Sequence, residues 1–239
     1  CGNRSGIFRD RIQDSRLHKQ NDGVYFVRTI KIVYLLWNMK RMDLLKRRWI
    51  WLCRFRHRRG YGVHSPFAFN FLTDVVYGKD EYYAYRTLKS RFNSGNWLDR
   101  SYRLKCNRFL FRLANYVHPR EILLYGDFSD EACAYLSEGC RCELIRAVEN
   151  SHCPVKIEAD RLICISESVA PAAWQAIVGN DWTLHSVCVI RGICRDEEAK
   201  RYWHELQKLP HAVVTFDLYE YGLIFYDLSK QRQHYIINF

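Results

Sequence analysis

The sequence lacks the patterns that mark fibrous, repetitive and membrane-spanning proteins. It has no internal repeat and no low-complexity tract, which argues against a solenoid or a fibre. No uninterrupted apolar run reaches the roughly 18 residues that a membrane-spanning helix needs. The longest candidate, residues 24–37, is shorter than that and contains Arg28 and Lys31. We therefore expect no transmembrane segment.

Cysteine pairs of the kind that bind zinc are also missing. The chain has 10 cysteines but no CxxC pair, and Cys140 and Cys142 are the only close pair. Cys164 and Cys188 lie inside apolar runs, where cysteine behaves as a small hydrophobic residue. We expect reduced thiols in a cytoplasmic protein, without a metal site.

The positive charge of the chain is concentrated near its start. The net charge is +11, yet residues 1–60 hold 16 Lys and Arg against 4 Asp and Glu, while the other 179 residues hold 21 against 22. A basic segment of this kind attracts polyanions such as nucleic acid or anionic lipid. A solvated basic face on a surface helix explains the same pattern and is the favoured interpretation.

The composition predicts a globular protein with one α/β domain and an appendage. Hydrophobic residues make up 48% of the chain and aromatic residues 15%, more than a disordered chain contains. Residues 1–41 are expected to be a poorly ordered basic arm or a non-native start, with Met39 and Met42 as alternative starts. A helical region follows at 42–118, and an α/β region at 119–239.

Hydrophobic periodicity predicts helices first and then alternating strands and helices. Residues 42–55 form a basic amphipathic pattern, and Ser65 and Pro66 begin the next helix with a capping hydroxyl and a proline at its first position. The other predicted helices are 82–91, 104–117, 129–138, 170–178 and 196–209. Ser129 is expected to open its helix and Gly139 to close it, and Asp196 is expected to cap the last helix. The predicted strands are 121–125, 142–148, 162–165, 186–190, 212–217, 223–227 and 234–239. Closely spaced strands pair antiparallel, so we expect a mostly parallel sheet with an antiparallel C-terminal end.

One segment resembles a known family. The run RRGYGVHSPF, residues 58–67, resembles the opening of a bacterial family of class I S-adenosylmethionine-dependent methyltransferases, in which an HSPF segment leads a helical lid. The pair Tyr82-Tyr83 and the tail, residues 218–226 and 233–239, are similar to that family as well. The resemblance covers roughly residues 45–239. It implies a Rossmann-like sheet with an antiparallel strand at its edge, a lid at 42–118, S-adenosylmethionine as cofactor and methyl transfer as activity.

The resemblance implies a cofactor site after the first two strands of the sheet. Gly126 and Asp127 stand in the turn where the family has a glycine-rich loop, although Phe128 takes the place of a small residue. Glu149 lies 23 positions after Gly126, close to the spacing at which an acidic residue binds ribose hydroxyls in dinucleotide folds. An ordinary surface glutamate at the end of a strand fits that position equally well.

The later strands depart from the family pattern. Ser166 follows the third strand, where the family has an aspartate, and Arg191 follows the fourth, where aspartates hold a metal ion in related enzymes. An arginine cannot coordinate a divalent cation, so we expect no metal. Ser166 and His64 complete the expected cofactor-binding set, with packing or capping of the lid as the alternative role of His64. No catalytic residue is assigned.

Three hypotheses for the function remain open. The first is an active, divergent methyltransferase with an unidentified small or macromolecular acceptor. The second is a catalytically inactive scaffold or partner-binding protein, because residues 150–161 are too few for the two crossovers and the strand of a complete sheet. The third is nucleic-acid binding through residues 40–60, which is not favoured because Trp49, Trp51 and Phe55 are expected to face the core.

Overall fold

The computed structural model describes residues 49–50, 52–57, 62–92, 97–140, 142–147, 160–180 and 183–239. The chain divides into two compact units, residues 1–53 and residues 54–239. The predicted basic arm, much of the predicted amphipathic helix and Glu149 lie outside the described residues. The sheet and the helices that cover it belong to the second unit.

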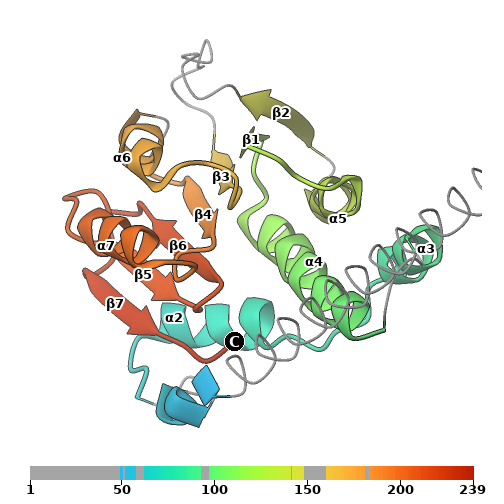
Figure 1. Ribbon diagram of the computed structural model, residues 1–239, viewed down its shortest axis with the longest axis horizontal. Coiled ribbons are helices and arrows are strands. Elements are labelled where there is room, and N and C mark those ends of the chain that lie inside the picture. Colours follow the sequence, from blue (N-terminus) through green and yellow to red (C-terminus); the bar gives the residue numbers. More distant parts are fainter. Residues whose placement is uncertain are drawn as a thin grey trace, which may run out of the picture. The chain divides into compact units, whose positions relative to one another are not determined.

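The second unit is an α/β fold around one seven-stranded sheet with the order β2-β1-β3-β4-β6-β5-β7 (Figure 1). The strands are β1 (Glu121–Tyr125), β2 (Glu143–Ala147), β3 (Arg161–Ile165), β4 (Val187–Arg191), β5 (Val214–Asp217), β6 (Tyr221–Phe225) and β7 (Gln233–Ile236). The four strands β2, β1, β3 and β4 are parallel neighbours. Strand β6 runs antiparallel to both β4 and β5. The predicted fold class, a mostly parallel α/β sheet with an antiparallel C-terminal end, is confirmed.

The C-terminal end of the sheet corrects two details of the prediction. The antiparallel strand β6 lies inside the sheet, between β4 and β5, and not at its edge. Strand β7 does not pair antiparallel with its predecessor in the chain but pairs parallel with β5. Both edges of β6 are already hydrogen-bonded, so residues 226–232 carry the chain past β5 to the free edge of that strand.

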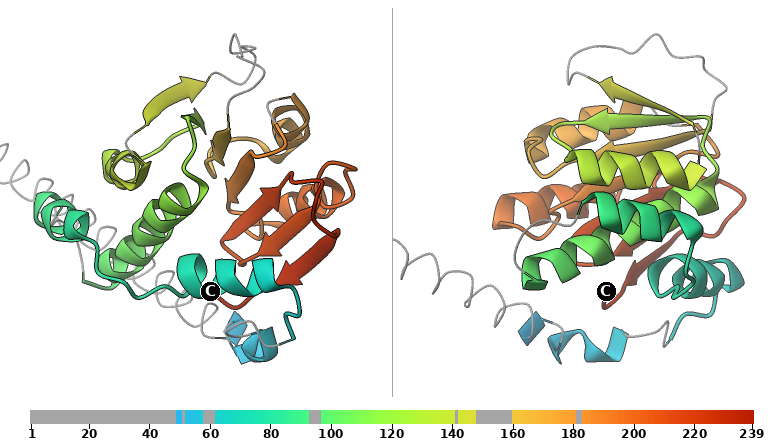
Figure 2. Two further views of the ribbon diagram at one scale, coloured as in Figure 1. Left: turned by 180° about the vertical axis from the view of Figure 1, so that it is seen from behind. Right: turned by 90° about the vertical axis from the view of Figure 1, so that its right-hand side faces the viewer.

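Helices cover both faces of the sheet (Figure 2). They are α2 (Pro66–Phe71), the π-helical turn Leu72–Val76, α3 (Tyr83–Arg91), α4 (Trp97–Val117), α5 (Asp130–Cys140), α6 (Pro171–Asn180) and α7 (Glu197–Leu206). Helices α2, α4 and α5 share one buried apolar cluster with the sheet, and α6 and α7 share a second. Helix α3 packs against α4 and α5 in a third cluster. Successive residues of a strand enter opposite clusters, as Leu123 and Leu124 of β1 do, because side chains alternate across a sheet.

Two helix starts form as the sequence predicts. The Ser65 hydroxyl accepts a hydrogen bond from the backbone N–H of Ala68 at 3.4 Å, at the start of α2. The Asp196 carboxylate accepts one from the backbone N–H of Ala199 at 2.7 Å, at the start of α7. Each cap satisfies a donor that has no partner within the first helical turn, which fixes where these helices begin.

The end of α5 differs from the prediction. Ser129 caps its start, but the helix continues through Gly139 to Cys140 and does not close at the glycine. A Cβ atom on Gly139 would lie 2.6 Å from the carbonyl oxygen of Phe111 and 3.0 Å from the Cβ of Ala114, both in α4. The glycine therefore permits two helices to pack closely, a contact that the local sequence does not reveal.

Two further observations concern the edge of the sheet and the basic segment. Among the described strands β2 is the outermost at its end of the sheet. Residues 150–159, on which the prediction of a shortened sheet depends, lie outside the described residues, so it stays a prediction. The Trp49 and Phe55 side chains are 66% and 46% exposed, so the expectation that they face the core is wrong, and Trp51 lies outside the described residues. None of the described helices is both long and apolar enough to cross a membrane.

Candidate functional site

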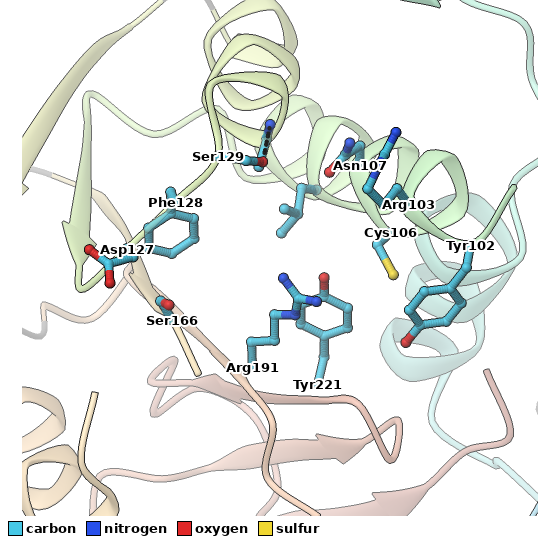
Figure 3. Close-up of a pocket in the computed structure, with 12 residues that line it drawn as sticks. Tyr102, Arg103, Cys106, Asn107, Asp127, Phe128, Ser129, Ser166, Arg191 and Tyr221 are labelled. Atoms are coloured by element: carbon cyan, nitrogen blue, oxygen red, sulfur yellow. Dashed lines mark hydrogen bonds between the residues drawn. The ribbon is translucent and has the colours of Figure 1, made fainter. Parts of the chain in front are cut away.

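A cavity of about 200 Å³ lies at the carboxyl ends of β1, β3 and β4 (Figure 3). The turns after β1 and β3 supply its rim on one side, and the end of β4 and the first residue of β6 supply its floor. Helix α4 closes it from above with Cys106, Asn107 and Leu110. In this fold class ligands bind outside the carboxyl ends of the strands, so the cavity stands where a site is expected.

The turn after β1 is built on Gly126, which has a φ of +82°. A Cβ atom at this position would lie 2.6 Å from the Oγ of Ser168 and 2.7 Å from the Cγ2 of Val169. The backbone N–H of Asp127 donates to the Oγ of Ser168 at 2.8 Å. Side chains of the loop after β3 therefore occupy the space beside Gly126 that a bound molecule could otherwise approach. The backbone N–H of Asp127 already has a hydrogen-bond partner within the protein.

Ser166 joins the same polar cluster. Its Oγ lies 3.2 Å from the Oγ of Ser168, and it also accepts a hydrogen bond from the backbone N–H of Ser168 at 3.2 Å. Ser166 is buried and lines the cavity. Hydrogen bonds therefore join Ser166 and Ser168 of the loop after β3 to each other, and Ser168 to the turn after β1.

Arg191 ends β4 and projects into the cavity (Figure 3). Its guanidinium lies 3.7 Å from a carboxylate oxygen of Glu167 and 3.7 Å from one of Glu220. Burial alone would lower the pKa of Arg191, but the nearby Tyr221 hydroxyl and the two glutamates raise it above the usual value. The cavity therefore contains a permanent positive charge, held by two long ion pairs.

Cys106 of α4 and Tyr221 of β6 both line the cavity. Burial raises the pKa of the Tyr221 hydroxyl well above its usual value. Burial likewise raises the pKa of the Cys106 thiol. Both groups are protonated at neutral pH, so the cavity offers neither a thiolate nucleophile nor a phenolate base from these two side chains.

The structure brings together some of the residues expected in the site. Asp127 and Ser166 line the cavity, and Gly126 forms the turn beside it. His64 is exposed and is not one of the lining residues. Glu149 lies outside the described residues. Asp127 is exposed and its carboxylate points away from the centre of the cavity in Figure 3.

The sequence interpretation missed the contribution of α4. Tyr102, Arg103, Cys106 and Asn107 reach the cavity although they precede the sheet in the chain. A signal was present, because only a short link separates the end of α4 from the amino end of β1. A helix of 21 residues spans about 30 Å, so its first half extends along the sheet to the carboxyl ends of the strands.

The residues of this cavity do not fit S-adenosylmethionine. Its volume of about 200 Å³ is below the range of about 300–1,000 Å³ that small-molecule sites occupy. The Phe128 ring lines the cavity where a small residue is expected, and Ser168 already engages the turn after β1. Among the described residues, no group of three or more His, Cys, Asp or Glu side chains could hold a metal ion.

Comparison with known proteins yields one structural likeness. No protein-family model matches the sequence, and no curated protein matches it. A solved structure of the methyltransferase PaMTH1 from Podospora anserina, bound to S-adenosylhomocysteine, resembles the chain with a TM-score of 0.41 and 13% sequence identity. The likeness covers 64% of this chain and 88% of that one. The fold assignment rests on the strand order of this chain.

Proposed function

We propose that this chain is a non-catalytic protein of the methyltransferase fold, whose remaining cavity binds a molecule smaller than S-adenosylmethionine. The proposal rests on one observation, which is that side chains of the protein occupy the space beside the turn after β1. Ser168 and Val169 occupy the space beside Gly126, and Ser168 accepts the backbone hydrogen bond of Asp127. A cofactor that needs this turn would have to displace side chains that already satisfy it.

The chemistry of the cavity supports a binding role. Methyl transfer can proceed by positioning alone, so the absence of a base would not abolish it. It does require the cofactor, and the space beside Gly126 is taken. Arg191, Asn107 and Tyr221 converge on the remaining cavity from three different elements, with Leu110 as an apolar wall. Such a mixture of a few polar groups and apolar surface is typical of small-molecule sites.

Titration calorimetry of the full chain with S-adenosylhomocysteine tests the non-catalytic part. We expect no saturable heat from a folded sample. A thermal melt in the same solution adds sensitivity, because a ligand at 100 times its Kd raises the free energy of unfolding by about 2.7 kcal/mol. Saturable binding that Gly126→Arg abolishes would overturn the proposal and restore the active methyltransferase as the leading hypothesis.

A ligand panel tests the binding part. Arg191 offers N–H donors to an acceptor oxygen, so the panel consists of amino acids and small carboxylic acids. We expect at least one of them to raise the melting temperature, and Arg191→Ala to remove that rise. Arg201→Ala, an exposed arginine on α7, is the matched control and should keep it. If no compound acts, or if both variants behave alike, the cavity is not the binding site.

The active methyltransferase is the second candidate. The position of the cavity at the carboxyl ends of β1, β3 and β4 favours it, because the cofactor of this fold class is expected at that edge. Glu149, two positions after the last residue of β2 in the sequence and outside the described residues, remains its proposed ribose ligand. Glu149→Ala should weaken any binding of S-adenosylhomocysteine by about tenfold, the loss of a hydrogen-bonded carboxylate.

A further inference from the structure

Two cysteines meet where α5 ends and β2 begins. Cys140 is the last residue of α5, and Cys142 directly precedes β2. Their Sγ atoms lie 2.6 Å apart, and both side chains are partly buried. A disulfide needs an S–S separation of about 2.05 Å, so the two atoms are about 0.6 Å from bonding distance.

The Cys140–Cys142 pair is the accessible part of a larger group of cysteines. Cys140 and Cys142 pack against the apolar cluster on the α4–α5 side of the sheet, and so does Cys133 of α5. Cys164 belongs to that cluster and is fully buried. All of these cysteines are free thiols in the structure. Cys164 is closed to reagents, whereas the Cys140–Cys142 pair has exposed surface.

The two thiols are not equivalent. Burial, together with the hydrogen bond to Cys140 and the charge that Cys140 would carry, raises the pKa of Cys142 to about 12. Cys142 therefore stays a thiol and can donate its proton to the sulfur of Cys140. Because the thiolate of Cys142 is rare at neutral pH, we expect the sulfur of Cys140 to react first.

We propose that Cys140 and Cys142 form a reversible dithiol–disulfide pair that ties the end of α5 to the start of β2, with a small disulfide such as oxidised glutathione as oxidant. The Cys140 thiolate attacks one sulfur of the oxidant, forms a mixed disulfide and releases a thiolate that takes up a proton. The sulfur of Cys142, once deprotonated, attacks the sulfur of Cys140 and releases the second thiolate. Two protein thiols and one small disulfide thus become one protein disulfide and two small thiols.

The test uses the full chain, reduced and then incubated with oxidised glutathione. Remaining thiols are alkylated at low pH, and the protein is digested with trypsin. Trypsin cuts after Arg141, between the two cysteines, so their disulfide appears as a crosslinked pair of peptides. We expect that pair, lighter by two hydrogen atoms than the separate peptides, and its complete loss after treatment with dithiothreitol.

Single variants test the order of attack, and their melting temperatures check that they fold. Cys142→Ser should retain glutathione on Cys140, because the resolving thiol is gone. Cys140→Ser should leave Cys142 at least about tenfold less modified, because its thiolate is rare. Cys53, an exposed cysteine, serves as the control for reagent access and should carry glutathione.

Three results would overturn the proposal. In the first, Cys140 and Cys142 remain open to alkylation while Cys53 carries glutathione. In the second, glutathione stays on Cys140 of the unaltered chain and no internal disulfide follows. In the third, the crosslink joins Cys133 to one member of the pair. None of these outcomes depends on what the cavity binds, so the pair is tested independently of the proposed function.

Discussion

An arginine lies at each end of the parallel strands, one at their amino ends and one at their carboxyl ends, and the two differ in their surroundings. At the amino edge, Arg161 is 1% exposed and pairs with Glu121 at 3.2 Å, its direct neighbour in the register of β3 and β1. At the carboxyl edge, Arg191 is 40% exposed and lies 3.7 Å from each of two glutamates. One arginine is locked between strands, and the other faces a cavity.

The difference indicates that the amino edge stabilises the fold and that the carboxyl edge is available for binding. The Arg161–Glu121 pair joins register partners on neighbouring strands, and the buried arginine offers no accessible N–H group to a ligand. A half-exposed arginine with long ion pairs contributes little to folding and keeps N–H groups that a ligand can use. The carboxyl edge is also where the turns after β1 and β3 meet, so a site is built there at small cost to the core.

The largest expected effect separates the two arginines. Arg161→Gln leaves the Glu121 carboxylate without its buried partner, which costs about 3–5 kcal/mol for a fully buried pair. Because Glu121 is 26% exposed and can regain water, we expect about 3 kcal/mol. Arg191→Gln should cost less than about 1 kcal/mol. Urea unfolding measures both values, and equal losses would remove the contrast between the edges.

The next prediction concerns the turn after β1. Gly126→Ala places a Cβ 2.6–2.7 Å from Ser168 and Val169 and also strains a φ of +82°. We expect a loss of about 2–3 kcal/mol, from about 1–2 kcal/mol of backbone strain and the remainder from overpacking. Gly62 has a φ of +81° but nothing within 4 Å, so Gly62→Ala should show the strain alone. Similar losses in the two variants would show that the turn is not filled.

Part of the carboxyl edge is tightly packed, as the surroundings of Gly222 show. A Cβ on Gly222 of β6 would lie 2.7 Å from the ring of Trp203, a buried residue of α7. Gly222→Ala should therefore destabilise the protein by about 2 kcal/mol, because a rigid ring cannot move aside. Gly179→Ala in α6 meets nothing within 4 Å and should stabilise by up to about 1 kcal/mol. Thermal melts of the two variants should shift in opposite directions.

The smallest expected effect is a pH dependence at the amino edge. Burial lowers the pKa of His211, which precedes β5, and burial together with the charge of Arg232 lowers that of His234 in β7. The folded protein then binds fewer protons than the unfolded chain. The contribution of the two neutral histidines to the free energy of unfolding is fully present above about pH 6.5, the pKa of histidine in the unfolded chain. It is lost as the pH falls through their lower pKa values in the folded protein.

Urea midpoints at about pH 7.5 and about pH 5 measure this dependence. We expect a lower midpoint in acid, and a smaller decrease in His211→Gln and in His234→Gln than in the unaltered chain. An unchanged decrease in both variants would place the acid sensitivity elsewhere. The comparison uses the change with pH within each variant, so a general loss of stability does not obscure it.

Much of the fold could be predicted from the sequence because its elements follow local patterns. Strand β1 has the predicted bounds, 121–125, because an apolar run between a proline and a glycine has few alternatives. The Ser65 and Asp196 caps form as expected. The errors lie where distant contacts decide the outcome, as at Gly139, where packing against α4 and not a helix end explains the glycine.

The site was only partly predictable, for the same reason. Asp127 and Ser166 follow strand ends, and the rule that ligands bind at the carboxyl edge finds such residues. Nothing near Cys106 or Tyr221 in the sequence shows that they meet in one cavity, since they come from α4 and β6. The expected place of His64 in the site has no support from the lining residues.

The sequence by itself determined the alternation of strands and helices, the helix starts and the location of the excess positive charge. These depend on periodicity, caps and composition, which are properties of residues close together in the chain. The tertiary structure alone decided that α4 covers the cavity, that β7 crosses to β5 and that Ser168 fills the turn after β1. The Asp127–Ser168 hydrogen bond joins residues 41 positions apart, and only the packing of two strands side by side brings them together.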